Sequence, residues 1–144
     1  MKRFSQFLCL ILVLSVIMVN PVFAQDSTTW QSYYFHSGLA YLYPTSGNQF
    51  EIWIEVEAVG TMDKLGASEI ILQRSSNNST WSDVKTYTKE AYPNLVADND
   101  FTHEAYVTYT GSSGYYYRAK VWFYAERGNG TAEYSYTTES IYVS

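Results

Sequence analysis

Residues 114–125 carry the feature that most constrains the fold, a run in which two kinds of side chain alternate. Every second position is apolar or aromatic, and this set comprises Tyr115, Tyr117, Ala119, Val121, Phe123 and Ala125. The intervening set contains both cations of the run and comprises Tyr116, Arg118, Lys120, Trp122 and Tyr124. Successive side chains of a β-strand point to opposite faces, so the run predicts a half-buried strand with the first set in the core.

A turn signal at residues 126–130 follows this strand, and a second aromatic-rich run occupies residues 132–143. The two runs predict a long antiparallel hairpin. The tip contains Arg127-Gly128-Asn129, in which Asn stands where an adhesion tripeptide would need Asp. Because Asn-Gly pairs favour the positive φ of a tight turn, we interpret the tip as turn chemistry.

A second clear alternation spans residues 50–58. It places Phe50, Ile52, Ile54, Val56 and Ala58 on one face, and Glu51, Trp53, Glu55 and Glu57 on the other. Weaker patterns predict strands at residues 30–43, 69–75, 81–89 and 101–110, a connector at 60–66 and a long loop at 92–100. About seven strands without a helix predict an all-β fold, an antiparallel two-sheet sandwich. Its core should contain Ile52, Ile54, Val56, Val121 and Phe123, with Trp81 capping it from the 69–89 hairpin.

Residues 1–24 read as a secretory signal peptide. Lys2 and Arg3 form a positive start, an apolar run covers residues 7–19, and Ala24 closes a cleavage site before Gln25. The apolar run is short for a membrane span. We therefore expect a secreted, extracellular protein with one domain at residues 25–144 and no membrane insertion after cleavage. Cys9 lies too early in the apolar run to be a lipoprotein cysteine.

Net charge and cysteine content limit which partners the protein can bind and whether it can form disulfides. Without Lys2 and Arg3, seven cations face 14 acids, a formal charge of −7 that argues against nucleic acid as partner. The single cysteine, Cys9, leaves with the signal peptide, so we expect a disulfide-free exported domain.

Several segments resemble immunoglobulin-like and fibronectin type III modules. They are Gln73-Arg74-Ser75, a polar loop, Trp81-Ser82-Asp83-Val84, and residues 115–125 with the glycine turn. The chain is also similar to small secreted Gram-positive bacterial proteins of unknown function. That similarity rests on residues 62–66, Tyr109-Thr110-Gly111, Gly114, Tyr117-Arg118-Ala119 and Phe123-Tyr124-Ala125. These resemblances imply a β-sandwich and no particular activity.

The sequence offers little for catalysis. His36 and His103 are its two histidines, and neither a Gly-x-Ser-x-Gly elbow nor an exported cysteine is present. We expect no enzyme activity, no cofactor and no metal site, with His103 as a hydrogen-bonded core or rim residue. Weak calcium binding at Asp98 and Asp100 stays open, although the segment lacks the spacing of an EF-hand.

The candidate ligand-binding residues are Tyr116, Arg118, Trp122 and Tyr124, the large side chains that alternation places outside the core. Flat aromatic rings beside polar groups stack on sugars or anchor protein partners. The simpler alternative is structural, because cross-strand aromatic pairs and pairs of Arg118 or Lys120 with Glu133 or Glu139 also stabilise sheets.

Two functions are consistent with these sequence features. The first is a secreted, non-catalytic protein that binds a protein or cell-envelope component. The second is a stand-alone carbohydrate-binding module, which a row of coplanar exposed aromatic residues would favour. A pocket with converging titratable groups would instead indicate an enzyme.

Overall fold

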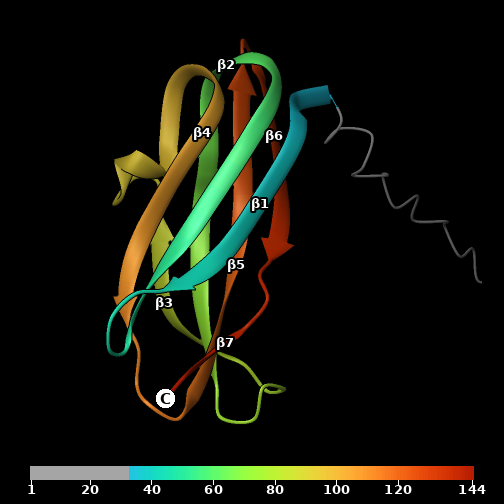
Figure 1. Ribbon diagram of the computed structural model, residues 1–144. Coiled ribbons are helices and arrows are strands. Elements are labelled where there is room, and N and C mark those ends of the chain that lie inside the picture. The colour runs from blue at the N-terminus through green and yellow to red at the C-terminus, as the bar shows by residue number, and fades with distance from the viewer. Residues whose placement is uncertain (1–32) are drawn as a thin grey trace, which may run out of the picture.

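The computed structural model describes residues 33–144. Its fold is built around a single long strand, β2 (Gln49–Ser75). Figure 1 shows β2 rising through one layer, turning over at the top and descending in the other layer. Its first half pairs antiparallel with β1 (Phe35–Pro44) and β4 (Val96–Thr110). Its second half pairs with β3 (Ser82–Thr88) and β5 (Tyr115–Arg127), so one curled sheet supplies both layers.

The remaining strands extend the layer that contains β5. Both β6 (Gly130–Thr137) and β7 (Ile141–Val143) pair antiparallel with β5, and a short 3₁₀ turn, η1 (Pro93–Leu95), precedes β4. Thr138 separates β6 from β7, and its backbone N–H and hydroxyl oxygen bond the backbone of Ala119. Within residues 33–144 the sheet has seven strands, all paired antiparallel.

The structure confirms an all-β antiparallel fold, but not its division into two sheets. Residues 60–66, predicted as a connector, continue β2, because Met62–Gly66 pairs with Val96–Asp100 across a register shift. The predicted loop at residues 92–100 likewise ends early, since β4 begins at Val96. The predicted signal peptide at residues 1–24 lies outside the described residues.

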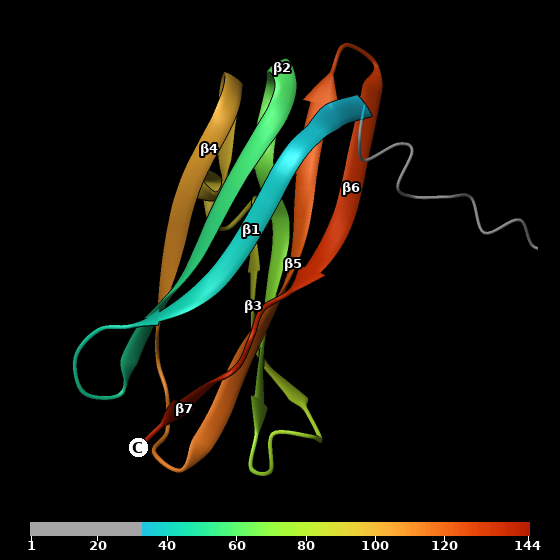
Figure 2. The same cartoon turned by 45° about the vertical axis from the view of Figure 1, so that its right-hand side comes forward.

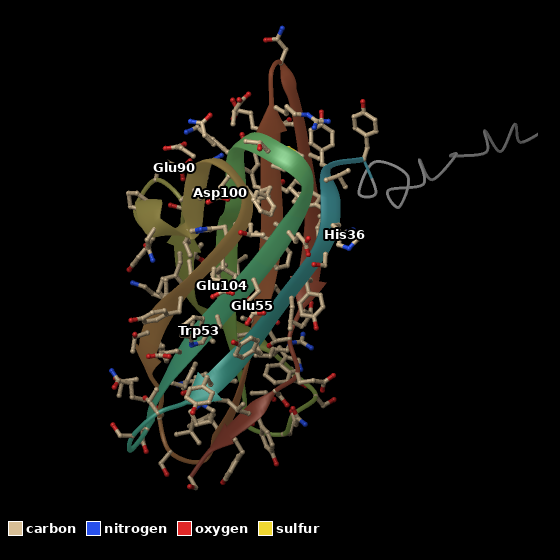
Figure 3. All side chains as sticks on the ribbon, turned by 45° about the horizontal axis from the view of Figure 1, so that its top comes forward. His36, Trp53, Glu55, Glu90, Asp100 and Glu104 are labelled. Carbon is tan, nitrogen blue, oxygen red and sulfur yellow. The ribbon has the colours of Figure 1, made fainter. Side chains whose placement is uncertain are left out.

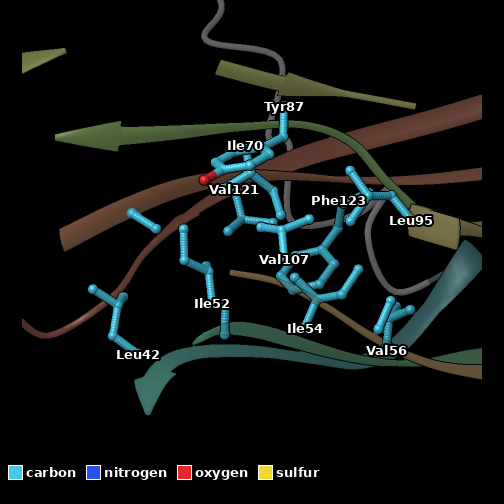
Figure 4. Close-up of a cluster of buried hydrophobic side chains, with 14 of the residues drawn as sticks. Leu42, Ile52, Ile54, Val56, Ile70, Tyr87, Leu95, Val107, Val121 and Phe123 are labelled. Atoms are coloured by element: carbon cyan, nitrogen blue, oxygen red, sulfur yellow. The ribbon is translucent and has the colours of Figure 1, made fainter. Parts of the chain in front are cut away.

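The core lies between the two layers of the curled sheet. Ile52 and Ile54 from one layer point toward Val121 and Phe123 from the other, as Figure 4 shows. These four side chains are fully buried and Val56 nearly so, which confirms the predicted core. The inward face of β5 is as predicted from Tyr117 to Ala125, whose alternate residues are buried, whereas Tyr115 at the start of the strand is half-buried.

Tyr134 of β6 fills the gap between the edge strands β1 and β6, which start close together (Figure 2). Its ring packs edge-on against Phe35, with centroids 4.9 Å apart, and lies 5.2 Å from the ring of Phe123. Gly38 makes room for it, since a Cβ at that position would overlap the Tyr134 hydroxyl. Burial raises the pKa of Tyr134 to about 12, so this phenol stays neutral inside the fold.

Candidate binding faces on the curled sheet

The outer face of β5 holds the four residues predicted to bind a ligand. Tyr116, Arg118, Trp122 and Tyr124 are all half-buried, whereas the intervening residues from Tyr117 to Ala125 are buried, so the predicted strand parity is correct. Half-burial shows that other side chains cover part of each residue. Those neighbours determine how much of this face a ligand could reach.

Arg118 lies against residues of the neighbouring strands. Its Nε donates a hydrogen bond of 2.9 Å to Gln73, and its guanidinium lies 4.3 Å from the centroid of the Trp81 ring. Arg118 therefore contacts the side-chain amide of Gln73 and the ring of Trp81, and not Glu133 or Glu139 as the structural alternative suggested. Trp81 is half-buried on this outer side instead of capping the core, because stacking with a cation compensates its exposure.

The aromatic residues of this face are also paired within the sheet. Tyr124 donates a 2.6 Å hydrogen bond to Glu126, and the ammonium of Lys89 lies 3.8 Å from its ring centroid. Burial first, and then the bond to Glu126, raise the pKa of Tyr124 to about 12. The Tyr116 ring lies 4.9 Å from that of Tyr142. Of these contacts, the pair Tyr116–Tyr142 between β5 and β7 is the cross-strand aromatic pairing of the structural alternative described above.

A second aromatic group lies on the outer face of the opposite layer. Tyr41 of β1, Trp53 of β2 and Tyr106 of β4 are direct cross-strand partners and form one row, here termed the aromatic ladder. The Trp53 ring lies 4.7 Å from Tyr106 and 6.4 Å from Tyr41, and both pairs are stacked. Tyr106 is 45% exposed, and Leu39 and Tyr43 beside the row are 45% and 57% exposed. Solvent therefore reaches a continuous aromatic and aliphatic surface on three adjacent strands.

Glutamates flank the aromatic ladder on both sides. Tyr41 donates a 2.7 Å hydrogen bond to Glu55, and the indole N–H of Trp53 donates one of 2.7 Å to Glu51. The bond to Glu55, followed by partial burial and the charges of Glu55 and Glu104, raises the pKa of Tyr41. Tyr41 and Trp53 thus each hold one carboxylate in a fixed position.

One of these carboxylates, that of Glu55, lies directly opposite another glutamate. Glu55 on β2 and Glu104 on β4 are cross-strand partners, and Figure 3 shows them next to Trp53. Like charges in this arrangement destabilise a sheet. Among residues 33–144 the one salt bridge joins Lys64 to Asp98, so no described cation neutralises the pair. The residues that line a shallow hollow beside them are Ser37, Leu39, Glu55, Val56, Glu57, Thr102, His103 and Glu104.

Sequence reasoning missed the aromatic ladder, although it assigned Trp53 to the outer face together with the glutamates. Tyr41 belongs to a segment without clear alternation, and Tyr106 was assigned no role on its predicted strand. The available signal was an outward-facing aromatic residue on each of three strands. Which of them meet depends on the pairing register, and strand patterns alone do not define that register.

Other candidate chemistry finds little support in the described residues. Among residues 33–144, no group of three or more His, Cys, Asp or Glu side chains is arranged to hold a metal ion. Asp98 pairs with Lys64 at 2.8 Å, and Asp100 accepts bonds from the backbone N–H groups of Phe101 and Thr102. His103 is half-buried, with a ring nitrogen 2.9 Å from the carbonyl oxygen of Asn94, as expected for a rim histidine.

No family model, curated protein or solved structure that was compared with this chain matches it. Within residues 33–144, no helix is long and apolar enough to cross a membrane. The fold and the two outer faces are therefore the basis for assigning a function.

Proposed function

We propose that this protein is a secreted, non-catalytic binding protein that contacts a protein or cell-envelope partner through the outer face of β1, β2 and β4. The observation that carries this proposal is the aromatic ladder, together with the exposed side chains of Leu39 and Tyr43. Aromatic side chains provide much contact area for a small loss of conformational entropy. Exposed apolar side chains grouped on one face are typical of interaction surfaces.

This face is better suited to binding than the outer face of β5. On the outer face of β5, Tyr116 contacts Tyr142, Trp122 contacts Lys120, and Tyr124 contacts Lys89 and Glu126. These three aromatic residues are half-buried, whereas Tyr43 and Tyr106 are among the most exposed large side chains. A partner gains more from covering exposed apolar area than from displacing contacts already made. The outer face of β5, with Arg118 and Trp122, remains the second candidate for the binding surface.

Export and kinship belong to the same proposal. The signal-peptide pattern at residues 1–24 supports export, and N-terminal sequencing of secreted protein should find Gln25 first. Retention of Met1 in a membrane fraction would contradict export. The segment similarities to immunoglobulin-like and fibronectin type III modules, and to small secreted Gram-positive proteins, support an exported β-sandwich and imply no particular activity.

A carbohydrate-binding module is the alternative function, favoured by the alignment of three aromatic side chains across adjacent strands. Sugar recognition needs free ring faces on which a pyranose can stack. The stacking of Trp53 between Tyr41 and Tyr106 turns ring faces toward each other. This arrangement favours a protein partner over a polysaccharide.

Retention of host components by immobilised protein tests the proposal. We compare Tyr43→Ser/Tyr106→Ser with Trp122→Ser/Tyr124→Ser, each measured against cell-envelope and secreted fractions of the host. Loss of retention in the first double variant alone, with an unchanged circular dichroism spectrum, is the expected result. Loss in the second variant alone would move the binding surface to β5. Retention that is abolished by added soluble glycans would favour the carbohydrate-binding alternative.

A further inference from the structure

We propose that the partner presents an extended, basic polypeptide segment, whose Lys or Arg side chains lie along the aromatic ladder between its glutamates. This inference rests on the proposed function, because it names the chemistry recognised by the same face. It follows from the charge of the face, the spacing of its acids and the position of the rings.

The charge of this face has one sign. Its outward positions include Glu51, Glu55, Glu57 and Glu104, and neither residues 33–58 nor residues 101–110 contain a Lys or Arg. The other layer differs, because Arg118, Lys120 and Lys89 lie there among acids. Complementary charge steers partners and selects among them, so the acidic face favours a cationic one.

The repulsion between Glu55 and Glu104 gives a cation a specific place to bind. An ammonium or guanidinium between these cross-strand partners would neutralise both, in the hollow that Leu39 and Glu57 also line. Trp53 and Tyr106 line a second hollow, which also includes Glu104, and aromatic rings attract such cations. The exposed Leu39 side chain can pack against the aliphatic stem of a lysine.

The carboxylates are also oriented before a partner arrives. Glu55 accepts from Tyr41, and Glu51 accepts from Trp53, each through one of its two oxygens. The second oxygen of each carboxylate retains acceptor capacity for a partner's N–H groups. Groups that are already fixed lose little conformational freedom on binding.

The spacing of the acids favours an extended segment over a free small cation. Glu51, Glu55 and Glu57 lie on one face of β2, with Trp53 between the first two, so they point the same way at multiples of roughly 6.6 Å. A partner strand running along β2 would present every second side chain at the same interval. Basic residues at alternate positions would then meet successive acids.

Fluorescence anisotropy with labelled synthetic peptides tests this inference. The sample is the full protein purified from its host. The probes are a peptide of alternating Lys and Thr, one of the same composition with its lysines in a block, and one of alternating Glu and Thr. The protein variants are Glu55→Gln/Glu104→Gln and the matched control Glu90→Gln/Glu139→Gln, which removes two exposed acids elsewhere. Neither pair removes a side chain from the core.

We expect the alternating Lys peptide to bind more tightly than the block peptide and the acidic peptide not to bind. Its Kd should rise about tenfold in Glu55→Gln/Glu104→Gln and stay unchanged in the control pair. Removing the repulsion should also leave the melting temperature of the variant equal to or above that of the parent. Added salt should weaken binding, because the interaction is between charges near the surface.

Equal loss in both variant pairs would reduce the effect to net charge and overturn the inference. Equal affinity for the two Lys peptides, or binding of an amino-sugar oligomer in their place, would also overturn it. If host retention depends on Tyr43 and Tyr106 but peptide binding ignores Glu55 and Glu104, the inference fails and the proposed function stands. If retention is indifferent to the tyrosines, the proposed function fails.

Discussion

A Cβ atom on Gly66 would overlap the backbone carbonyl oxygen of Leu95 and lie 2.8 Å from the Cα of Val96. Gly66 lies in the second half of β2, between Val96 of β4 and Tyr124 of β5. The close approach of the η1–β4 backbone to β2 therefore depends on the absence of a side chain at this position.

Gly66→Ala should lower the free energy of unfolding by at least about 2 kcal/mol, because backbone atoms must move to admit the methyl group. The matched control is Gly114→Ala, where φ is +85° and no atom lies within 4 Å of the new Cβ. Backbone strain alone should cost the control about 1 kcal/mol. Urea denaturation compares the two, and equal losses would show that β4 can retreat from β2 without cost.

Phe123→Ala should cost roughly 3–5 kcal/mol, as is usual when a large aromatic side chain is removed from a core. Phe123 is fully buried and contacts the ring of Tyr134. Phe101→Ala makes the same chemical change at a side chain that is 53% exposed, and should cost well under half as much. A loss below about 1 kcal/mol for Phe123→Ala would place this side chain outside the core.

Alkaline pH should destabilise the protein through Tyr134. Burial, with a smaller contribution from the neighbouring Tyr136, raises its pKa to about 12, against about 10 in an unfolded chain. Between these values the unfolded state loses a proton that the folded state keeps. The contribution to stability is therefore complete below about pH 10 and is lost as pH rises toward 12.

Tyr134→Phe should flatten the fall in stability across this alkaline range, while Tyr43→Phe, at an exposed position, should leave the slope as it is. Unfolding followed by fluorescence at increasing pH provides the measurement, and tyrosinate absorbance reports the titration directly. An unaltered slope in Tyr134→Phe would assign the alkaline loss to other tyrosines.

Reducing agents should leave the free energy of unfolding unchanged. The chain contains one cysteine, Cys9, so no disulfide can form within a single chain. Denaturation with and without dithiothreitol checks this expectation. A shift of the midpoint would indicate a disulfide between two copies of the chain or to another thiol.

Alternating side chains made much of the fold predictable. The runs at residues 50–58 and 114–125 bury the expected faces, because a one-residue slip would expose the whole apolar set. The continuity of β2 was not predictable in the same way. Gly60 and Gly66 suggested a connector, and only the pairing of Lys64 with Asp98 and its neighbours makes that segment a strand.

The sequence predicted which face of β5 the candidate site residues lie on, but not which side chains contact them. Arg118 and Trp122 lie on the outer face as expected, but the side chains that cover them come from strands whose register the sequence leaves undefined. Trp81 shows the difficulty, since an aromatic residue at a hairpin base can pack inward or stack on an external cation. The aromatic ladder was not predicted for the same reason, since the pairing register of three separate strands brings its members together.

The passage of β2 from one layer to the other also bears on how the molecule opens. In a sandwich of separate sheets, the layers can part by losing apolar contacts between them. Here β4 accompanies β2 through the turn, so parting the layers also breaks backbone hydrogen bonds near Met62 and Lys64. Amide protons at this turn should therefore exchange with solvent at the rate set by global unfolding, and both layers should form one cooperative unit.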